Sequence, residues 1–168
     1  MASSVDDDPI RSPSAAPLRE RVRETMVADE IQAIHERARN SFLGKDLSGF
    51  MEIYSPTLLY RLFDGRVIDR DQLRRDVDRQ FRTYDRFRIF SDRESLEVDG
   101  DRAEEYRTQS SSASLSAFLV VQRTWNVVRR SRIVWARSDG RWRVEEVEVL
   151  GEEIDGRVRL GFRVGPGH

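Results

Sequence analysis

Few side chains of this chain are suited to catalysis, and His35 is the foremost of them. Cysteine is absent from the 168 residues, and the only other histidine is the last residue. A chain without cysteine has no thiolate nucleophile and no disulfide. His35 lies beside Ile31, Ala38 and Phe42 in a helical pattern, and an imidazole with a near-neutral pKa is a competent general base. A lone histidine beside an apolar stripe is nevertheless more often a hydrogen-bonded packing residue.

Two glutamates near the end of the chain form a second candidate acid-base site. Side chains alternate along a strand, so four residues share one face of the last predicted strand: Trp142, Val144, Glu146 and Glu148. If that face is the core face, Glu146 is a candidate general base in a pocket. A β-bulge at Glu145 and Glu146 would reverse the arrangement, because Val147 and Val149 would then point inward. The sequence leaves both arrangements open.

A further set of polar and aromatic residues is suited to ligand binding. Arg107 and Gln109 share one strand face, and an inward arginine can hold a ligand carboxylate through two hydrogen bonds. Tyr60, Trp125 and Trp135 are predicted to line a pocket for a flat apolar ligand. Solvent exposure of Arg107, and core or dimer contacts of the aromatic residues, are the simpler alternatives.

The composition argues against several classes of function. Catalytic zinc usually needs three protein ligands rich in histidine, so we expect no metal and no cofactor. The 29 basic and 30 acidic residues leave a net charge of −1, which provides no general attraction to nucleic acid or anionic lipid. Arginines alternate with aromatic residues over Arg79–Arg88, but aspartates interrupt them, so nucleic-acid binding is not expected. Met1–Pro17 lacks the apolar core of a signal peptide and no membrane span is evident, so we expect a cytoplasmic protein.

The elements that must position these residues begin with helices. Residues 1–17, rich in Asp, Pro, Ser and Ala, are expected to be disordered. Residues 18–152 form the predicted domain, and residues 153–168 form a C-terminal extension with the alternation of a short strand. Apolar residues recur at helical spacing from Leu18 to Leu43, with Gly44 as the stop. A short helix begins at Asp46, and a third runs from Asp69 or Asp71 to about Tyr84.

The rest of the chain is predicted to be an antiparallel meander. Four Asp-Gly pairs are typical of tight hairpin turns: Asp64-Gly65, Asp99-Gly100, Asp139-Gly140 and Asp155-Gly156. The strands expected between them are 57–63 with 67–68, 87–98 with 102–109, 118–129 with 132–137, and 141–150. The serine-rich segment 110–116 is predicted to be a connection. The fold class is therefore α+β, with N-terminal helices packed on a curved antiparallel sheet.

Three segments, in this order and spacing, carry a resemblance to a known family. They are Ile31–Leu43 followed by Gly44-Lys45-Asp46-Leu47, then Phe50–Ser55, then Trp135–Val144. From Asp29 to Glu152 the chain resembles the nuclear transport factor two-like superfamily and its SnoaL-like domains, which include ketosteroid isomerase. The resemblance implies a cone-shaped α+β barrel around an apolar pocket. It also implies a homodimer formed through the outer face of the sheet.

The catalytic residues of the enzymes in that superfamily do not carry over to this chain. The ketosteroid isomerase base aligns with Leu62, and the second acid of that family aligns with Arg132 or Ile133. Arg107 matches the arginine of the limonene epoxide hydrolases, but Gln109 stands where an aspartate is expected, and a glutamine cannot take a proton from water. The histidine pair of the scytalone dehydratases is missing. The resemblance therefore implies a fold rather than an activity.

Three functional hypotheses follow. The leading one is a SnoaL-like domain that binds a small apolar or amphipathic molecule in a central pocket. The second is an acid-base enzyme of the isomerase, cyclase or hydratase type. In it His35 or Glu146 is the general base, and Arg107 or Tyr60 stabilises developing negative charge. The third is a dimerisation or adaptor module that uses the sheet face without a ligand.

Overall fold

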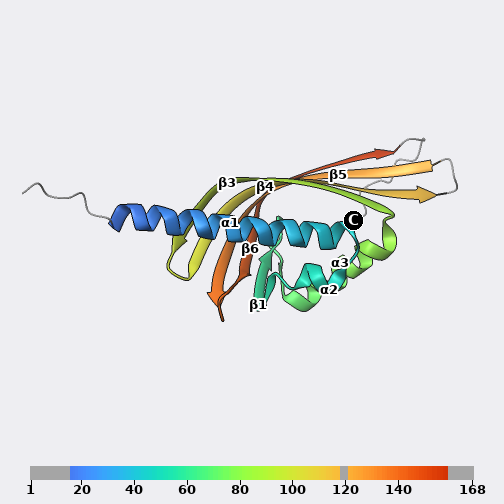
Figure 1. The fold of residues 1–168 in the computed structure, drawn as a ribbon. Helices are drawn as coiled ribbons and strands as arrows, with labels where there is room; N and C mark the ends of the chain where they lie inside the picture. The colour runs from blue at the N-terminus through green and yellow to red at the C-terminus, as the bar shows by residue number, and fades with distance from the viewer. Residues whose placement is uncertain (1–15, 118–120, 159–168) are drawn as a thin grey trace, which may run out of the picture.

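A long helix lies along the inner face of a curved six-stranded sheet, and two shorter helices pack near the C-terminal end of that helix (Figure 1). This computed structural model describes residues 16–117 and 121–158. The α+β fold class is confirmed. No helix within these residues is long and apolar enough to cross a membrane.

The three helices begin and end near the predicted residues. Helix α1 spans Ala16–Leu43, and the N–H of Gly44 donates to the carbonyl of Asn40 at 2.9 Å. Helix α2 spans Leu47–Met51, and the Asp46 side chain caps its first turn. Helix α3 spans Arg70–Thr83, and Asp69 caps it by accepting the backbone N–H of Gln72. An N-cap carboxylate satisfies a helical N–H that has no partner within the helix, which explains why both aspartates mark helix starts.

The sheet has the strand order β2-β1-β6-β5-β4-β3. The strands are β1 Tyr54–Arg61, β2 Val67–Ile68, β3 Arg86–Asp99, β4 Arg102–Ala117, β5 Val121–Ser138 and β6 Arg141–Val158. Four neighbouring pairs are antiparallel, but β1 and β6 are parallel, so the sheet is mixed. The predicted meander did not include this pair, because no local turn joins the two strands.

Three of the four predicted Asp-Gly turns are confirmed. Gly65, Gly100 and Gly140 all have positive φ, at 87°, 60° and 72°, which glycine adopts without a steric cost. The turn predicted at Asp155-Gly156 is wrong, since these two residues lie within β6 and pair with Asn126 and Trp125. Pairing with β5 over the whole length of the strand outweighs the local preference of Asp-Gly for a turn.

Two predictions about the middle strands are also wrong. The serine-rich segment 110–116 belongs to β4, where all its residues pair with β5 and residues 110–114 also pair with β3. The predicted hairpin between 118–129 and 132–137 is instead the single strand β5. Serine has little intrinsic preference for strands, and here two neighbouring strands supply the hydrogen bonds that decide the conformation.

The core lies between α1 and the inner face of the sheet. Four of its side chains are almost inaccessible to solvent: Ile31, Leu58, Trp135 and Val144. Along β6 the buried residues are Trp142 and Val144, and then Val147 and Val149. The register against β5 shifts between Val134 and Trp135, which leaves Glu145 as an extra residue. The bulged alternative is therefore the one that the chain adopts, and the alternation changes face at Glu145.

The predicted terminal segments are described only in part. Ala16 and Pro17 belong to α1, and residues 1–15 of the predicted disordered tail lie outside the described residues. Residues 153–158 of the predicted extension continue β6, and residues 159–168 lie outside the described residues.

Candidate functional site

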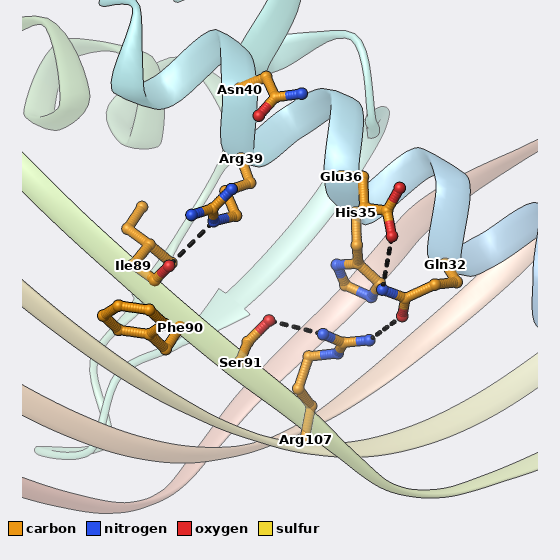
Figure 2. Close-up of a pocket in the computed structure, with 9 residues that line it drawn as sticks. All are labelled: Gln32, His35, Glu36, Arg39, Asn40, Ile89, Phe90, Ser91 and Arg107. Atoms are coloured by element: carbon orange, nitrogen blue, oxygen red, sulfur yellow. Dashed lines mark hydrogen bonds between the residues drawn. The ribbon is translucent and has the colours of Figure 1, made fainter.

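A cavity of about 360 Å³ opens between α1 and β3, with β4 beneath it (Figure 2). Nine residues line it: Gln32, His35, Glu36, Arg39 and Asn40 from α1, Ile89, Phe90 and Ser91 from β3, and Arg107 from β4. The α1 residues recur every three or four positions, so they share one face of the helix. The lining is mostly polar, and the inward side chain of Ile89 supplies its apolar part. The side chain of Phe90 lies on the other face of β3, since Phe90 pairs with Ser110 and is 65% exposed.

A buried carboxylate lies under one wall of this cavity. Glu105 on β4 has no exposed surface. Its Oε2 accepts hydrogen bonds from His35 Nε2 at 2.8 Å and from Trp135 Nε1 at 3.0 Å. Its Oε1 accepts from Arg93 Nε at 2.9 Å and Arg107 Nε at 3.1 Å. Four donors therefore converge on one carboxylate, which compensates for its removal from water.

The surroundings of Glu105 keep it ionised. Burial disfavours the charged form, yet the pKa of the Glu105 carboxyl is lowered to about 2. The hydrogen bond and charge of His35 contribute, together with Arg107 and Arg93. A guanidinium does not lose its proton in proteins, so Arg93 and Arg107 hold Glu105 in its charged form whether or not His35 is protonated.

The same cluster fixes the proton on His35. Burial lowers the pKa of His35 below its usual 6.5, and Arg107 and Arg93 lower it further, while Glu105 opposes them. The imidazole is then neutral at neutral pH. An ionised carboxylate has no proton to donate, so the single ring proton must lie on Nε2. Nδ1 keeps its lone pair, and none of the hydrogen bonds within the described residues involves it. A positioned imidazole with a free Nδ1 can accept a proton.

The buried guanidinium of Arg107 joins the cavity to the cluster beneath it. The Arg107 side chain is 4% exposed. Besides the bond to Glu105, Nη1 donates to Ser91 Oγ at 2.6 Å and Nη2 to Gln32 Oε1 at 2.9 Å (Figure 2). Arg107 therefore faces inward. Of the two alternatives that the sequence left open, an inward arginine or a solvent-exposed one, the first is the one found.

The other predicted pocket residues lie outside this cavity. Trp135 is fully buried beneath His35, with the two rings in an edge-to-face contact at 5.1 Å. Tyr60 is half-buried on β1, where burial raises the pKa of its hydroxyl. Trp125 contacts Tyr84 near the end of α3, with ring centroids 5.2 Å apart. Gln109 is half-buried and pairs with Ser91 across the sheet, without lining the cavity.

Glu146 is not brought together with His35. Because of the bulge at Glu145, its side chain is 41% exposed and lies on the outer face, where Arg132 Nη1 donates to it at 3.1 Å. Arg132 also pairs with Glu104 at 2.9 Å and lies 3.7 Å from Glu148. The outward arrangement of both glutamates is thus the one found, and the only predicted site residues that line the cavity are His35 and Arg107.

Three residues of the site were not predicted from the sequence, namely Glu105, Arg93 and Ser91. A signal for Glu105 was present, since Ala103, Glu105, Arg107 and Gln109 follow the same two-residue alternation. An acidic residue that alternates with an inward arginine predicts a buried ion pair. Arg93 likewise continues the alternation of Ile89 and Ser91 on β3, which changes face only after Arg93, at the register shift between Arg93 and Ser95.

Comparison with solved structures shows the class of fold. The chain resembles a conserved protein from Planctomyces limnophilus, with a TM-score of 0.68 and 8% identity over 79% of this chain and 99% of that one. It also resembles a putative dehydratase of the nuclear transport factor two-like family from Streptomyces avermitilis, with a TM-score of 0.60 and 11% identity over 73% and 94%. A type 2 hexachlorocyclohexane dehydrochlorinase has a TM-score of 0.61 and 12% identity over 86% and 97%.

This chain therefore has the nuclear transport factor two-like fold, as the sequence resemblance implied. No family model matches the chain, and no curated protein matches its sequence. At these low identities the similarity extends to the fold alone, so a function must be argued from the residues of the cavity.

Proposed function

We propose that this protein binds a small amphipathic molecule in the cavity between α1 and β3. The supporting observation is the lining itself, in which the buried Arg107 and the partly buried His35 lie opposite Ile89. Binding sites commonly combine an apolar wall with a few fixed polar groups. The fixed groups here are held by Glu105, Ser91 and Gln32 rather than by solvent.

A matched pair of α1 variants tests this proposal. Asn40 lines the cavity and Ala33 does not, although both are exposed residues of the same helix. The protein is screened against a small-molecule panel by ligand-observed NMR, and native mass spectra record any molecule retained through purification. Asn40→Trp is expected to abolish binding and Ala33→Trp to retain it. Hits that bind both variants equally well would place the binding site elsewhere, and a panel without hits would count against the proposal.

A second candidate function, proton transfer by His35, is favoured by the His35–Glu105 hydrogen bond. This bond holds the imidazole in the tautomer whose Nδ1 is free to take a proton from a carbon acid. Arg107, on the same cavity wall, would stabilise the resulting negative charge, whereas Tyr60 and Glu146 lie away from the cavity. Two of the structurally similar proteins, a putative dehydratase and a dehydrochlorinase, are named for eliminations, which require loss of a proton.

Deuterium exchange tests proton transfer without knowledge of the full reaction. Phenylacetone is incubated with the protein in D₂O, and loss of its acidic C–H signals is followed by NMR. Catalysed exchange is expected for the unmodified protein and for Glu146→Gln, and it should be lost in His35→Gln. Exchange that continues in His35→Gln would show that His35 is not the base.

For assembly, we propose a homodimer through the outer face of the sheet. Short side chains occupy that face in the second half of β4, where Ser110, Ser112 and Ser114 alternate with the inward residues. Val128 of β5, opposite Ser110, is 38% exposed. Native mass spectra measure the subunit number directly. A charged replacement, Val128→Asp, should shift a dimer toward monomer if this face is the interface.

A further inference from the structure

The buried cluster beneath the cavity carries more positive than negative charge. Arg93 and Arg107 both form their ion pair with Glu105, and no second carboxylate pairs with either of them among the described residues. His35 is neutral when its single ring proton lies on Nε2, so it does not change the charge of the cluster. One carboxylate therefore pairs with two guanidiniums, which leaves the cluster with one excess positive charge. Because the Arg107 side chain is 4% exposed, water does little to screen the remaining positive charge.

Unused hydrogen-bond donors accompany this charge at the cavity wall. A guanidinium has five N–H groups, and Arg107 uses three of them for Glu105, Ser91 and Gln32. The Ser91 hydroxyl accepts from Arg107, so its own proton is free to be donated. A second guanidinium, that of Arg39, donates through Nε to the carbonyl of Ile89 at 2.9 Å, which leaves its two terminal nitrogens for a ligand.

The remaining groups of the cavity limit the kind of anion. Glu36 is the only acidic residue of the lining, it is exposed, and it accepts from Gln32 Nε2 at 3.2 Å. A single excess positive charge suits a monoanion better than a dianion. Ile89 supplies the apolar side chain of the cavity, and it is 9% exposed. A planar carboxylate accepts two parallel hydrogen bonds from a guanidinium, and an apolar body would lie against Ile89.

We propose that the ligand of this cavity is a small monocarboxylate with an apolar body, whose carboxylate binds Arg107 and Arg39. This inference rests on the proposed binding function and specifies the class of molecule bound.

A matched acid and amide test it. Phenylacetate and the neutral phenylacetamide are titrated separately into the protein, and binding is followed by chemical-shift changes at Ser91 and at the Nε–H of Arg107. Phenylacetate is expected to bind about tenfold more tightly than phenylacetamide. Arg39→Gln should weaken phenylacetate binding by about fivefold and leave phenylacetamide binding unchanged. Arg37→Gln, an exposed α1 residue outside the cavity lining, is the control and should change neither.

The contrary outcomes separate this inference from the proposed function. Equal affinities for the acid and the amide would overturn the carboxylate assignment while leaving small-molecule binding in place. Unchanged phenylacetate affinity in Arg39→Gln would remove Arg39 from the site and overturn the two-arginine arrangement. If neither probe shifts the resonances of Ser91 and Arg107 at millimolar concentration, the monocarboxylate inference fails. The panel screen, which compares the Asn40→Trp and Ala33→Trp variants, then decides separately whether the cavity binds other molecules.

Discussion

His35 and Glu105, 70 residues apart in the chain, are joined by a hydrogen bond of 2.8 Å between Nε2 and Oε2. The bond crosses from the helix to the sheet, and it places a neutral imidazole between a buried carboxylate and an open cavity. The tautomer of His35 and the charge of Glu105 both depend on neighbouring side chains. Glu105 fixes the tautomer of His35, while Arg93 and Arg107 keep Glu105 charged.

The protonation state of His35 is the first prediction. Its pKa should lie below 6.5, because burial and two nearby guanidiniums disfavour the imidazolium. NMR of the ring carbons and nitrogens against pH measures both the pKa and the tautomer, and it should place the proton of the neutral ring on Nε2. A pKa above 6.5, or a proton on Nδ1, would contradict the arrangement described above.

Replacing the buried carboxylate should be far more damaging than replacing an exposed one. Glu105→Gln leaves the buried Arg107 and the partly buried Arg93 without their ion pair, and it should lower the free energy of unfolding by about 3 kcal/mol or more. Glu146→Gln is the control, because its side chain is 41% exposed and such a pair contributes less than about 1 kcal/mol. Urea unfolding measures both. Similar losses for the two variants would mean that the Glu105 cluster adds no special stability.

Stability should fall in acid in two steps. The folded protein holds His35 neutral, so below pH 6.5 the unfolded chain gains a proton that the folded protein does not, and stability declines. Glu105, with a pKa of about 2 against an ordinary 4.5, contributes stability that is complete above pH 4.5 and is lost as the pH falls toward 2. That contribution is about 3 kcal/mol.

Single variants separate the two steps. Urea unfolding at a series of pH values should show no decline just below pH 6.5 in His35→Gln, and a shallower decline below pH 4.5 in Glu105→Gln. An unaltered pH profile in both variants would assign the acid sensitivity to other carboxylates.

Loss of the indole N–H of Trp135 should destabilise the protein even when an aromatic ring remains in its place. Trp135→Phe keeps an aromatic ring in the core but removes the donor 3.0 Å from Glu105 Oε2, which should cost about 1–3 kcal/mol. It should also raise the pKa of His35 measured by NMR, because the carboxylate then depends more on the imidazole. In Trp125→Phe, where no hydrogen bond of the indole is found among the described residues, that pKa should not change.

Lys45, the one lysine of the chain, should stabilise the end of α3. Its Nζ donates to the carbonyls of Phe81 and Tyr84 at 2.9 and 2.6 Å, where a positive charge also interacts favourably with the helix dipole. Lys45→Met removes both bonds and should reduce the free energy of unfolding by about 1–3 kcal/mol. Hydrogen exchange should locate the loss in α3, whereas a uniform loss of protection would point to a different role.

Lys45 also has a positive φ of 57°, which glycine adopts more readily than a residue with a side chain. Lys45→Gly should therefore be the more stable of the pair Lys45→Gly and Lys45→Ala. Both variants lack the amine, so the difference between them is the backbone strain of alanine less the larger conformational entropy that glycine loses on folding. Equal or lower stability of Lys45→Gly would show that the strain does not exceed this entropy.

Local signals in the sequence were sufficient for most of the fold. The helix caps at Asp46 and Asp69 and the turns at Gly65, Gly100 and Gly140 were all predictable, because each depends on residues within a few positions. The same local reasoning failed at Asp155-Gly156 and in the serine-rich part of β4, where long-range pairing determines the strand. The parallel pairing of β1 with β6 could not be predicted from local signals either.

The candidate site was only partly predictable. His35 and Arg107 were identified from their positions in amphipathic patterns, and both line the cavity. Glu146 was left undecided by the sequence, since one extra residue at Glu145 reverses which side chains face inward. Glu105 was missed although it shares the alternation of Arg107.

By itself, the sequence determined the helices and three of the tight turns, because periodicity and turn chemistry act over short distances. Only the tertiary structure decided the site. The carboxylate of Glu105 receives its hydrogen bonds from α1, β3, β4 and β5, and those elements meet only when the sheet curves around the helix. The burial and charge of Glu105 follow from the packing of these elements, and so does the protonation state of His35.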